Sequence, residues 1–99
     1  MLTQVDKKFL KAYASNISVA EHVGKDGLGR NVIEQIDKNL KANEIIKIKV
    51  LPNSMLEPKE VLGSLALSLG AEPVQAIGRM VILYRYSTTK KEHILKKEK

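Results

Sequence analysis

The segment from Glu44 to Leu51 constrains the fold more than any other stretch of this chain. It reads Glu-Ile-Ile-Lys-Ile-Lys-Val-Leu, an alternating pattern that is typical of a strand with one buried face. The buried face is predicted to consist of Ile46, Ile48 and Val50. Lys47 and Lys49 lie on the opposite face, so one side of the strand packs and the other presents two ammonium groups.

Amphipathic helices are predicted on both sides of this strand. Apolar residues at spacings of three and four mark a helix over residues 28–42, with Asn43 as its left-handed stop. A second helix over residues 58–69 begins at a proline, and Gly70 is positioned as its left-handed cap.

The rest of the chain continues this alternation. Residues 3–15 are predicted to form a helix that starts with a capping box of Thr3 and Asp6, and Phe9 and Tyr13 belong to its apolar set. Residues 17–23 predict a short strand that runs into a glycine-bounded turn. Two further strands, over residues 74–77 and 80–86, are joined by Gly78-Arg79 in a tight hairpin.

The resulting order is α-β-α-β-α-β-β. Strand-helix-strand units pair in parallel with right-handed crossovers, whereas the final hairpin is antiparallel. We therefore expect an α/β fold, a two-layer sandwich with a mixed four-stranded sheet. No repeat or linker interrupts it, so a single domain is predicted over residues 1–87, followed by a basic tail over 88–99.

The net charge favours a polyanionic partner. Seventeen Lys and Arg residues against eleven Asp and Glu residues give +6, and five lysines against two glutamates put half of that excess after residue 86. A terminal charge run of this kind is typically solvated and frayed. The chain has neither a secretory signal nor an apolar run long enough for a membrane span, so we expect it in the cytoplasm.

Side-chain combinations that support catalysis or metal binding are weak in this sequence. The pairs Glu34–Asp37 and Glu57–Glu60 each share a helix face, which is typical of solvated helix surfaces. Cysteine is absent, and the two histidines are far apart in the sequence. We expect no enzyme activity, no metal site, no cofactor and no small-molecule substrate.

The segment Gly24-Lys25-Asp26-Gly27 is the one feature that suggests a mechanism. A glycine-bounded loop lets main-chain N–H groups approach a phosphate, and the dipole of the following helix favours that charge. Lys25 and Arg30 supply mobile positive charge. The alternative is a plain strand-to-helix connection, because Asp-Gly is an ordinary turn signal.

Three blocks of sequence resemble the CRM domain, the chloroplast RNA splicing and ribosome maturation family, in its bacterial stand-alone form. The resemblance extends from about Thr3 to Ser87. The blocks are the glycine loop at residues 23–28, the strand at 44–49 and the closing hairpin at 75–85. Gly29 stands where the family commonly has a threonine, which removes a favoured helix-capping hydroxyl.

The resemblance implies a fold similar to the C-terminal domain of translation initiation factor three. It also implies RNA binding through the glycine loop and the neighbouring basic surface, with ribosomal RNA in large-subunit precursors as the partner. The residues expected to bind RNA are Gly24, Lys25, Asp26, Gly27, Arg30, Lys47, Lys49 and Arg85.

Other classes of function are also compatible with the sequence. The leading alternative is a protein-interaction module whose basic face docks acidic partners. Membrane-surface binding through residues 90–99 is disfavoured, because Ile94 and Leu95 offer little apolar area, so no membrane partner is expected. An enzyme acting on RNA is least favoured.

Overall fold

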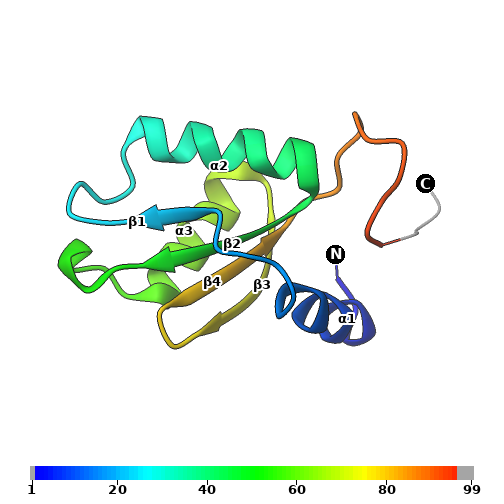
Figure 1. Cartoon of the computed structure of the whole chain (residues 1–99), viewed down its shortest axis with the longest axis horizontal. Helices are drawn as coiled ribbons and strands as arrows, with labels where there is room; N and C mark the ends of the chain where they lie inside the picture. The colour runs from blue at the N-terminus through cyan, green and yellow to red at the C-terminus, as the bar shows by residue number, and fades with distance from the viewer. Residues whose placement is uncertain (1, 96–99) are drawn as a thin grey trace.

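The computed structural model describes residues 2–95 of the chain, and the element labels are those of Figure 1. The helices are α1 (Gln4–Ala14), α2 (Arg30–Asn43) and α3 (Pro58–Leu69), with a short 3-10 turn, η1 (Pro52–Ser54). The strands are β1 (Glu21–Val23), β2 (Ile45–Val50), β3 (Glu72–Ile77) and β4 (Met80–Tyr84). The predicted order of elements is confirmed.

The four strands form one mixed sheet in the order β1-β2-β4-β3. β1 runs parallel to β2, and β4 pairs antiparallel with both β2 and β3. The hairpin turn between β3 and β4 contains Gly78 at a φ of +58°, a conformation that glycine adopts without strain. β1 and β3 are therefore the edge strands, and β1 leads directly into the glycine loop.

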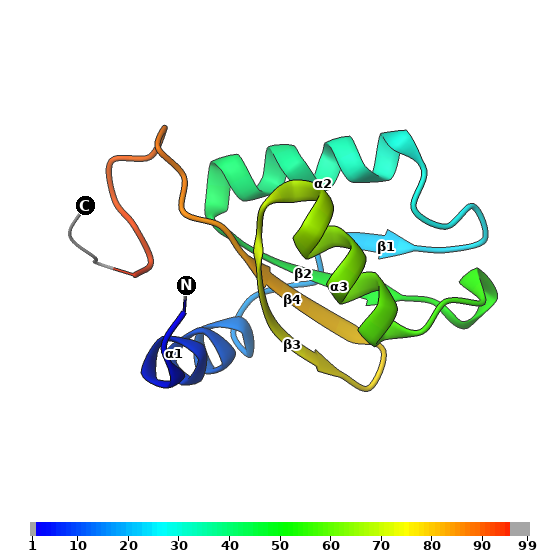
Figure 2. The same cartoon turned by 180° about the vertical axis from the view of Figure 1, so that it is seen from behind.

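Helices α2 and α3 cover one face of the sheet, as Figure 2 shows from behind. The alternating face of β2 lies under them, with Ile46, Ile48 and Val50 at most 1 % exposed. The helices contribute Ile36, Leu40, Val61 and Leu65 to the same cluster. Burial of these side chains supplies the main stabilisation of the domain, at roughly 1.5–3 kcal/mol for each.

Helix α1 packs on the opposite face of the sheet (Figure 1). Leu10 and Ala14 are buried there against side chains of all three long strands, among them Val74 and Tyr84. At this end the sheet lies between helices on both sides. Near the hairpin turn α1 no longer covers this face, and Ile77 is 59 % exposed.

The prediction that Phe9 and Tyr13 belong to the apolar packing set of α1 is wrong. Phe9 is 47 % exposed and Tyr13 39 % exposed, and their ring centroids lie 6.2 Å apart. The helix uses only the narrow stripe of Leu10 and Ala14 against the sheet, because one helix on a sheet face buries one side alone. The two rings, four residues apart, therefore form an exposed pair.

The helix ends follow the predicted chemistry with one change of residue. The Thr3 hydroxyl accepts from Asp6 N–H at 3.0 Å, and the Asp6 carboxylate accepts from Thr3 N–H at 3.1 Å, which confirms the capping box. Gly70 adopts the left-handed conformation after α3. After α2, however, the left-handed residue is Glu44 at a φ of +69°, whereas Asn43 is still helical.

The chain after β4 is docked against the domain as far as residue 95, contrary to the expectation of a solvated, frayed terminus. The fully buried carboxylate of Glu44 accepts hydrogen bonds from Ser87 N–H at 2.8 Å and Ile94 N–H at 3.0 Å. Leu95 is 6 % exposed and packs in the cluster that α1 forms with the sheet. The last four residues, 96–99, which include three of the five lysines of the predicted tail, lie outside the described residues.

Candidate nucleic-acid interface

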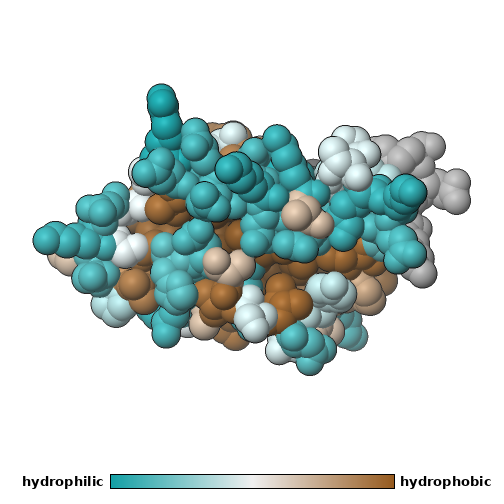
Figure 3. All heavy atoms as spheres, turned by 45° about the horizontal axis from the view of Figure 1, so that its top comes forward, coloured by the Kyte–Doolittle hydropathy of each residue, from teal (hydrophilic) through white to brown (hydrophobic). Residues whose placement is uncertain are grey.

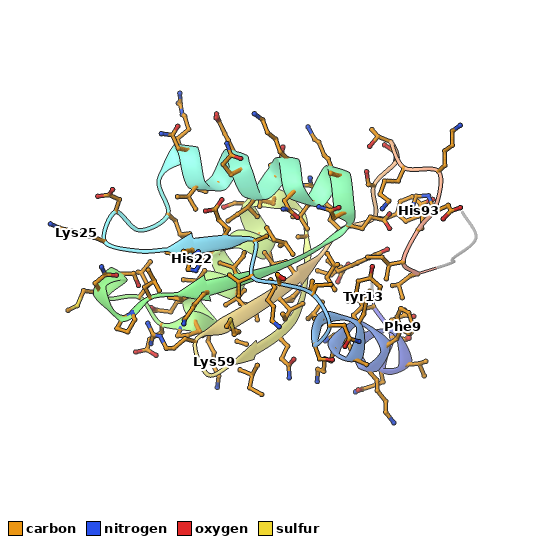
Figure 4. The ribbon with its side chains drawn as sticks, viewed as in Figure 1. Phe9, Tyr13, His22, Lys25, Lys59 and His93 are labelled. Atoms are coloured by element: carbon orange, nitrogen blue, oxygen red, sulfur yellow. The ribbon has the colours of Figure 1, made fainter. Side chains whose placement is uncertain are left out.

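The glycine loop is a tight turn at one end of the molecule. Gly27 N–H donates to the Gly24 carbonyl at 2.9 Å, which places Lys25 and Asp26 at the two central, exposed positions. Gly27 has a φ of +67°, a left-handed conformation that a side chain would disfavour. Figure 4 shows Lys25 projecting outward from the tip of this loop.

A second layer of contacts holds the base of the loop. Leu51 N–H donates to the Val23 carbonyl at 2.8 Å, just before the first glycine. A Cβ built on Gly24 would lie 3.5 Å from Leu51 Cδ1 and 3.7 Å from Asn53 Oδ1. The loop is therefore seated beside the turn η1, and its first glycine has ordinary space around it.

Arg79 holds the segment after β2 that supports the loop, a role that could not be predicted from the sequence. Its guanidinium donates from Nε to Val50 O at 2.8 Å and from Nη2 to Leu51 O at 3.2 Å and Leu56 O at 3.3 Å. The hairpin turn and the segment that supports the loop are thereby joined. The sequence does not predict these hydrogen bonds, because the acceptors are main-chain carbonyls, which every residue type provides.

The start of α2 has features that suit an anion. Gly29 is the N-cap residue and makes no side-chain capping hydrogen bond, as expected from the missing threonine. The first turn holds no acidic residue, and Arg30 is exposed at its first position. Unpaired N–H groups and the positive end of the helix dipole therefore lie beside Lys25 and its loop.

The two lysines of β2 have different roles. Lys47 Nζ donates to the carbonyls of Ala14 at 3.1 Å and Ile17 at 3.3 Å, so it ties the C-terminal end of α1 to the sheet. Lys49 is half-buried in register with His22 of β1, on the same face of the sheet. Of the two, Lys49 is the cation nearer to the loop end of the strand.

The guanidinium of Arg85 is engaged between helices. It donates to Leu69 O at the end of α3 at 2.9 Å and to Asp37 O in α2 at 3.1 Å, and it pairs with Asp37 Oδ1 at 2.9 Å. The hydrogen bond from Arg85 lowers the pKa of the Asp37 carboxyl, with Lys41 adding to the effect and partial desolvation opposing it. The side chain of Arg85 is 19 % exposed, so its first role is to join α2 and α3.

Most of the acidic and histidine side chains considered as catalytic candidates make contacts that stabilise the fold. Glu60 accepts from Glu57 N–H at 3.4 Å in a capping box at the start of α3, and Asp37 pairs with Arg85. His22 is exposed on the edge strand, whereas His93 contacts the Glu44 carboxylate. Within residues 2–95, no group of three or more His, Cys, Asp or Glu side chains is arranged to hold a metal, and no helix could span a membrane.

The surface in Figure 3 is hydrophilic along the outer side of α2 and hydrophobic in a band below it. The hydrophilic side carries Arg30, Lys38 and Lys41, all exposed. Two of the cations expected to bind RNA are thus exposed at this end of the molecule, Lys25 in the glycine loop and Arg30 at the first position of α2, while Lys47 and Arg85 hold other elements in place.

The structure is that of a small α/β domain in which a glycine turn joins an edge strand to a helix, with basic side chains nearby. The model of the CRS1 / YhbY (CRM) domain matches residues 2–85, and the chain belongs to that family. The probable RNA-binding protein YqeI of Bacillus subtilis is 36 % identical over 92 residues, which cover 93 % of this chain and 96 % of the relative.

Other relatives agree with this assignment. A Haemophilus influenzae protein named an RNA-binding protein is 29 % identical over 97 % of both chains. The solution structure of a Staphylococcus aureus protein, described as a candidate RNA-binding protein, superposes with a TM-score of 0.77 at 40 % identity, covering 92 % of this chain and 95 % of that one. The expected family and fold are thus confirmed.

Proposed function

We propose that this protein binds single-stranded RNA through the loop of residues 24–27 and the start of α2, without catalysing a reaction. The observation that carries the proposal is the loop itself. It brings an exposed lysine, a left-handed glycine and an uncapped helix N-terminus together at one end of the molecule. Relatives that match nearly the whole chain are named RNA-binding proteins, which supports the same ligand.

In this mechanism the residues of the site have distinct tasks. Gly24 and Gly27 allow a phosphate to approach the main chain, and Lys25 and Arg30 neutralise its charge. Asp26 completes the turn, and Lys49 extends the basic surface across the adjoining sheet face. Lys47 and Arg85 act as positioning residues, since their head groups are already hydrogen-bonded to carbonyls of other elements.

We further propose that the RNA is ribosomal RNA in precursors of the large subunit, and that the protein works in the cytoplasm. The resemblance to the CRM family supports ribosomal RNA as the ligand. A basic surface alone does not choose among RNA molecules, because phosphate contacts carry no sequence information.

The experiment is crosslinking of the tagged protein to RNA in growing cells, followed by sequencing of the bound RNA. Lys25→Asp is compared with Lys59→Asp, which makes the same charge change at an exposed lysine of α3 that points in a different direction (Figure 4). We expect reads on large-subunit ribosomal RNA that are lost in Lys25→Asp alone. Association with ribosomal particles that survives RNase treatment would instead favour docking on an acidic protein.

A further inference from the structure

A pocket at the far end of β1 from the glycine loop is lined by aromatic, amide and basic side chains. It has a volume of ≈ 200 Å³ and lies between α1, the start of β2, the end of α2 and the C-terminal segment. Its lining consists of Tyr13, Ile17, Ser18, Ala20, Asn39, Asn43, Ile45, Ile46, Lys47 and Lys90. The lining thus holds two lysines and no carboxylate.

The pocket exists because β1 is short. The register between β1 and β2 begins at Glu21 opposite Ile48, with one further hydrogen bond from Ala20 N–H to Lys47 O at 2.8 Å. Upstream of Ala20 the two chains separate, and the space beside the start of β2 is left open. The hydrophobic floor of this space is formed by Ile17, Ile45 and Ile46.

The walls offer groups that recognise an aromatic heterocycle. Tyr13 presents an exposed ring, which the hydrogen bonds from Lys47 to the end of α1 help to fix. Asn43 Nδ2 donates to Asn39 Oδ1 at 3.2 Å, so the two amides are paired and keep a further carbonyl oxygen and amino group for a ligand. Stacking on an aromatic ring together with amide hydrogen bonds is the usual way in which proteins hold an unpaired base.

The placement of the pocket connects it to the glycine loop. Ala20 lines the pocket and Gly24 opens the loop, so the two sites lie at opposite ends of the three-residue edge strand β1. The four residues from Ala20 to Gly24 span about 13 Å of extended chain. Figure 4 places Tyr13 and Lys25 toward opposite ends of the molecule, whose longest extent is 40 Å, so an RNA that contacts both side chains must reach beyond the ends of β1.

The geometry points to a second RNA contact in this pocket. Tyr13 and the Asn39–Asn43 pair bind one unpaired base, and Lys90 contacts the phosphate of that nucleotide. The nucleotide belongs to the same RNA strand that the glycine loop binds. This inference rests on the proposed function, because the loop supplies the first contact. It adds a site and a length requirement, since an oligonucleotide long enough to reach both ends of β1 gains contacts that a short one lacks.

The test compares labelled single-stranded RNAs of about 4 and about 12 nucleotides in binding titrations with the full chain. Loops of this kind clamp about four nucleotides, so the short RNA reports on the loop alone. For the wild-type protein we expect the longer RNA to bind more tightly. Tyr13→Ala and Asn43→Ala should weaken its binding about tenfold while leaving the short RNA unchanged, and Tyr13→Phe should keep the ring and the affinity.

Val5→Ala is the control, because Val5 is 77 % exposed on the same helix and does not line the pocket. Equal losses in Val5→Ala and Tyr13→Ala, or no loss in either, would overturn the pocket assignment. The side-chain amide signals of Asn39 and Asn43 in NMR spectra provide a direct readout, and we expect them to shift with the longer RNA. A shift with a polyglutamate peptide and none with RNA would overturn the inference in favour of a protein ligand.

Failure of the proposed function has a different outcome from failure of this inference. If neither RNA binds in a Lys25-dependent manner, the loop assignment falls. If both RNAs require Lys25 and Tyr13→Ala changes neither affinity, the loop stands and the pocket alone is wrong.

Discussion

His93 and Glu44 are 49 residues apart in the sequence, and His93 Nδ1 lies 2.5 Å from Glu44 Oε2. The same imidazole stacks on Tyr86, with ring centroids 4.2 Å apart and planes at 16°. One buried carboxylate at the end of α2 therefore holds the segment that follows β4 against the domain. Lys90, which lines the pocket proposed above, belongs to this held segment.

Replacement Glu44→Gln should destabilise the protein by about 1–3 kcal/mol, because an amide cannot satisfy donors that all point at a carboxylate. The loss is measured as a shift of the urea unfolding midpoint. Glu34→Gln, at an exposed position of α2, is the control and should change little. Unchanged stability of Glu44→Gln would show that the C-terminal segment is not held by this carboxylate.

The same carboxylate predicts a loss of stability in acid. Burial opposes ionisation of Glu44, but hydrogen bonds from Ser87, His93 and Ile94 outweigh it and lower its pKa below the ordinary 4.5. Its contribution is complete above pH 4.5 and is lost as the pH falls through the lower folded value. The stability difference between wild type and Glu44→Gln should therefore shrink below pH 4.5, whereas a constant difference down to pH 3 would contradict the assignment.

Tyr84 predicts a loss of stability in alkali. Burial, with the nearby charge of Glu44 adding to it, raises the pKa of the Tyr84 phenol to about 12. The unfolded chain then ionises near pH 10 before the folded one does, so this contribution disappears as the pH rises from 10 to about 12. Tyr84→Phe should flatten the stability profile over that range, and identical profiles for the two proteins would refute the prediction.

Arg85 should contribute to the stability of the fold and not to RNA affinity. Arg85→Ala removes hydrogen bonds to Leu69, Asp37 and the Asp37 carboxylate, so we expect a loss of about 1–3 kcal/mol in unfolding free energy. At a temperature where the variant is folded, its affinity for RNA should remain near that of the wild type. A tenfold loss of affinity in folded Arg85→Ala would mean that the guanidinium contacts RNA directly.

The two loop glycines should respond differently to alanine. Gly27→Ala forces a left-handed alanine at a φ of +67° and should cost about 1–2 kcal/mol of stability. Gly24→Ala places its Cβ at an ordinary distance from Leu51, so stability should change by no more than about 0.5 kcal/mol. A clear loss of RNA affinity in stable Gly24→Ala would then report the close approach of RNA to that main chain, and full affinity would place the RNA elsewhere.

Much of the fold could be predicted because it depends on local pattern. The alternation of Ile46, Ile48 and Val50 determines which face of β2 is buried, and Gly70 and Gly78 stand where left-handed conformations are required. The glycine turn could likewise be predicted. The contacts of Arg79, Arg85 and Lys47 could not, because their acceptors are main-chain carbonyls, which every residue type provides.

Two further features could not be predicted from the sequence for a related reason. Glu44 is fully buried only because donors from a segment more than forty residues away converge on it. The exposure of Phe9 and Tyr13 depends on how α1 is rotated against the sheet, and helical spacing leaves that rotation undetermined. Both features are consequences of tertiary packing. The proposed pocket, which Tyr13 lines, could therefore not be predicted from sequence periodicity.

The most direct test of the central claim is the salt dependence of single-stranded RNA affinity, measured for wild type, Lys25→Glu and the control Lys59→Glu. Contacts to roughly three to five phosphates predict a slope of log affinity against log salt of about −2 to −3.5. Lys25→Glu should make the slope shallower by about 0.7 and Lys59→Glu should leave it unchanged. A flat slope in the wild type, or equal effects of the two reversals, would contradict RNA binding through the glycine loop.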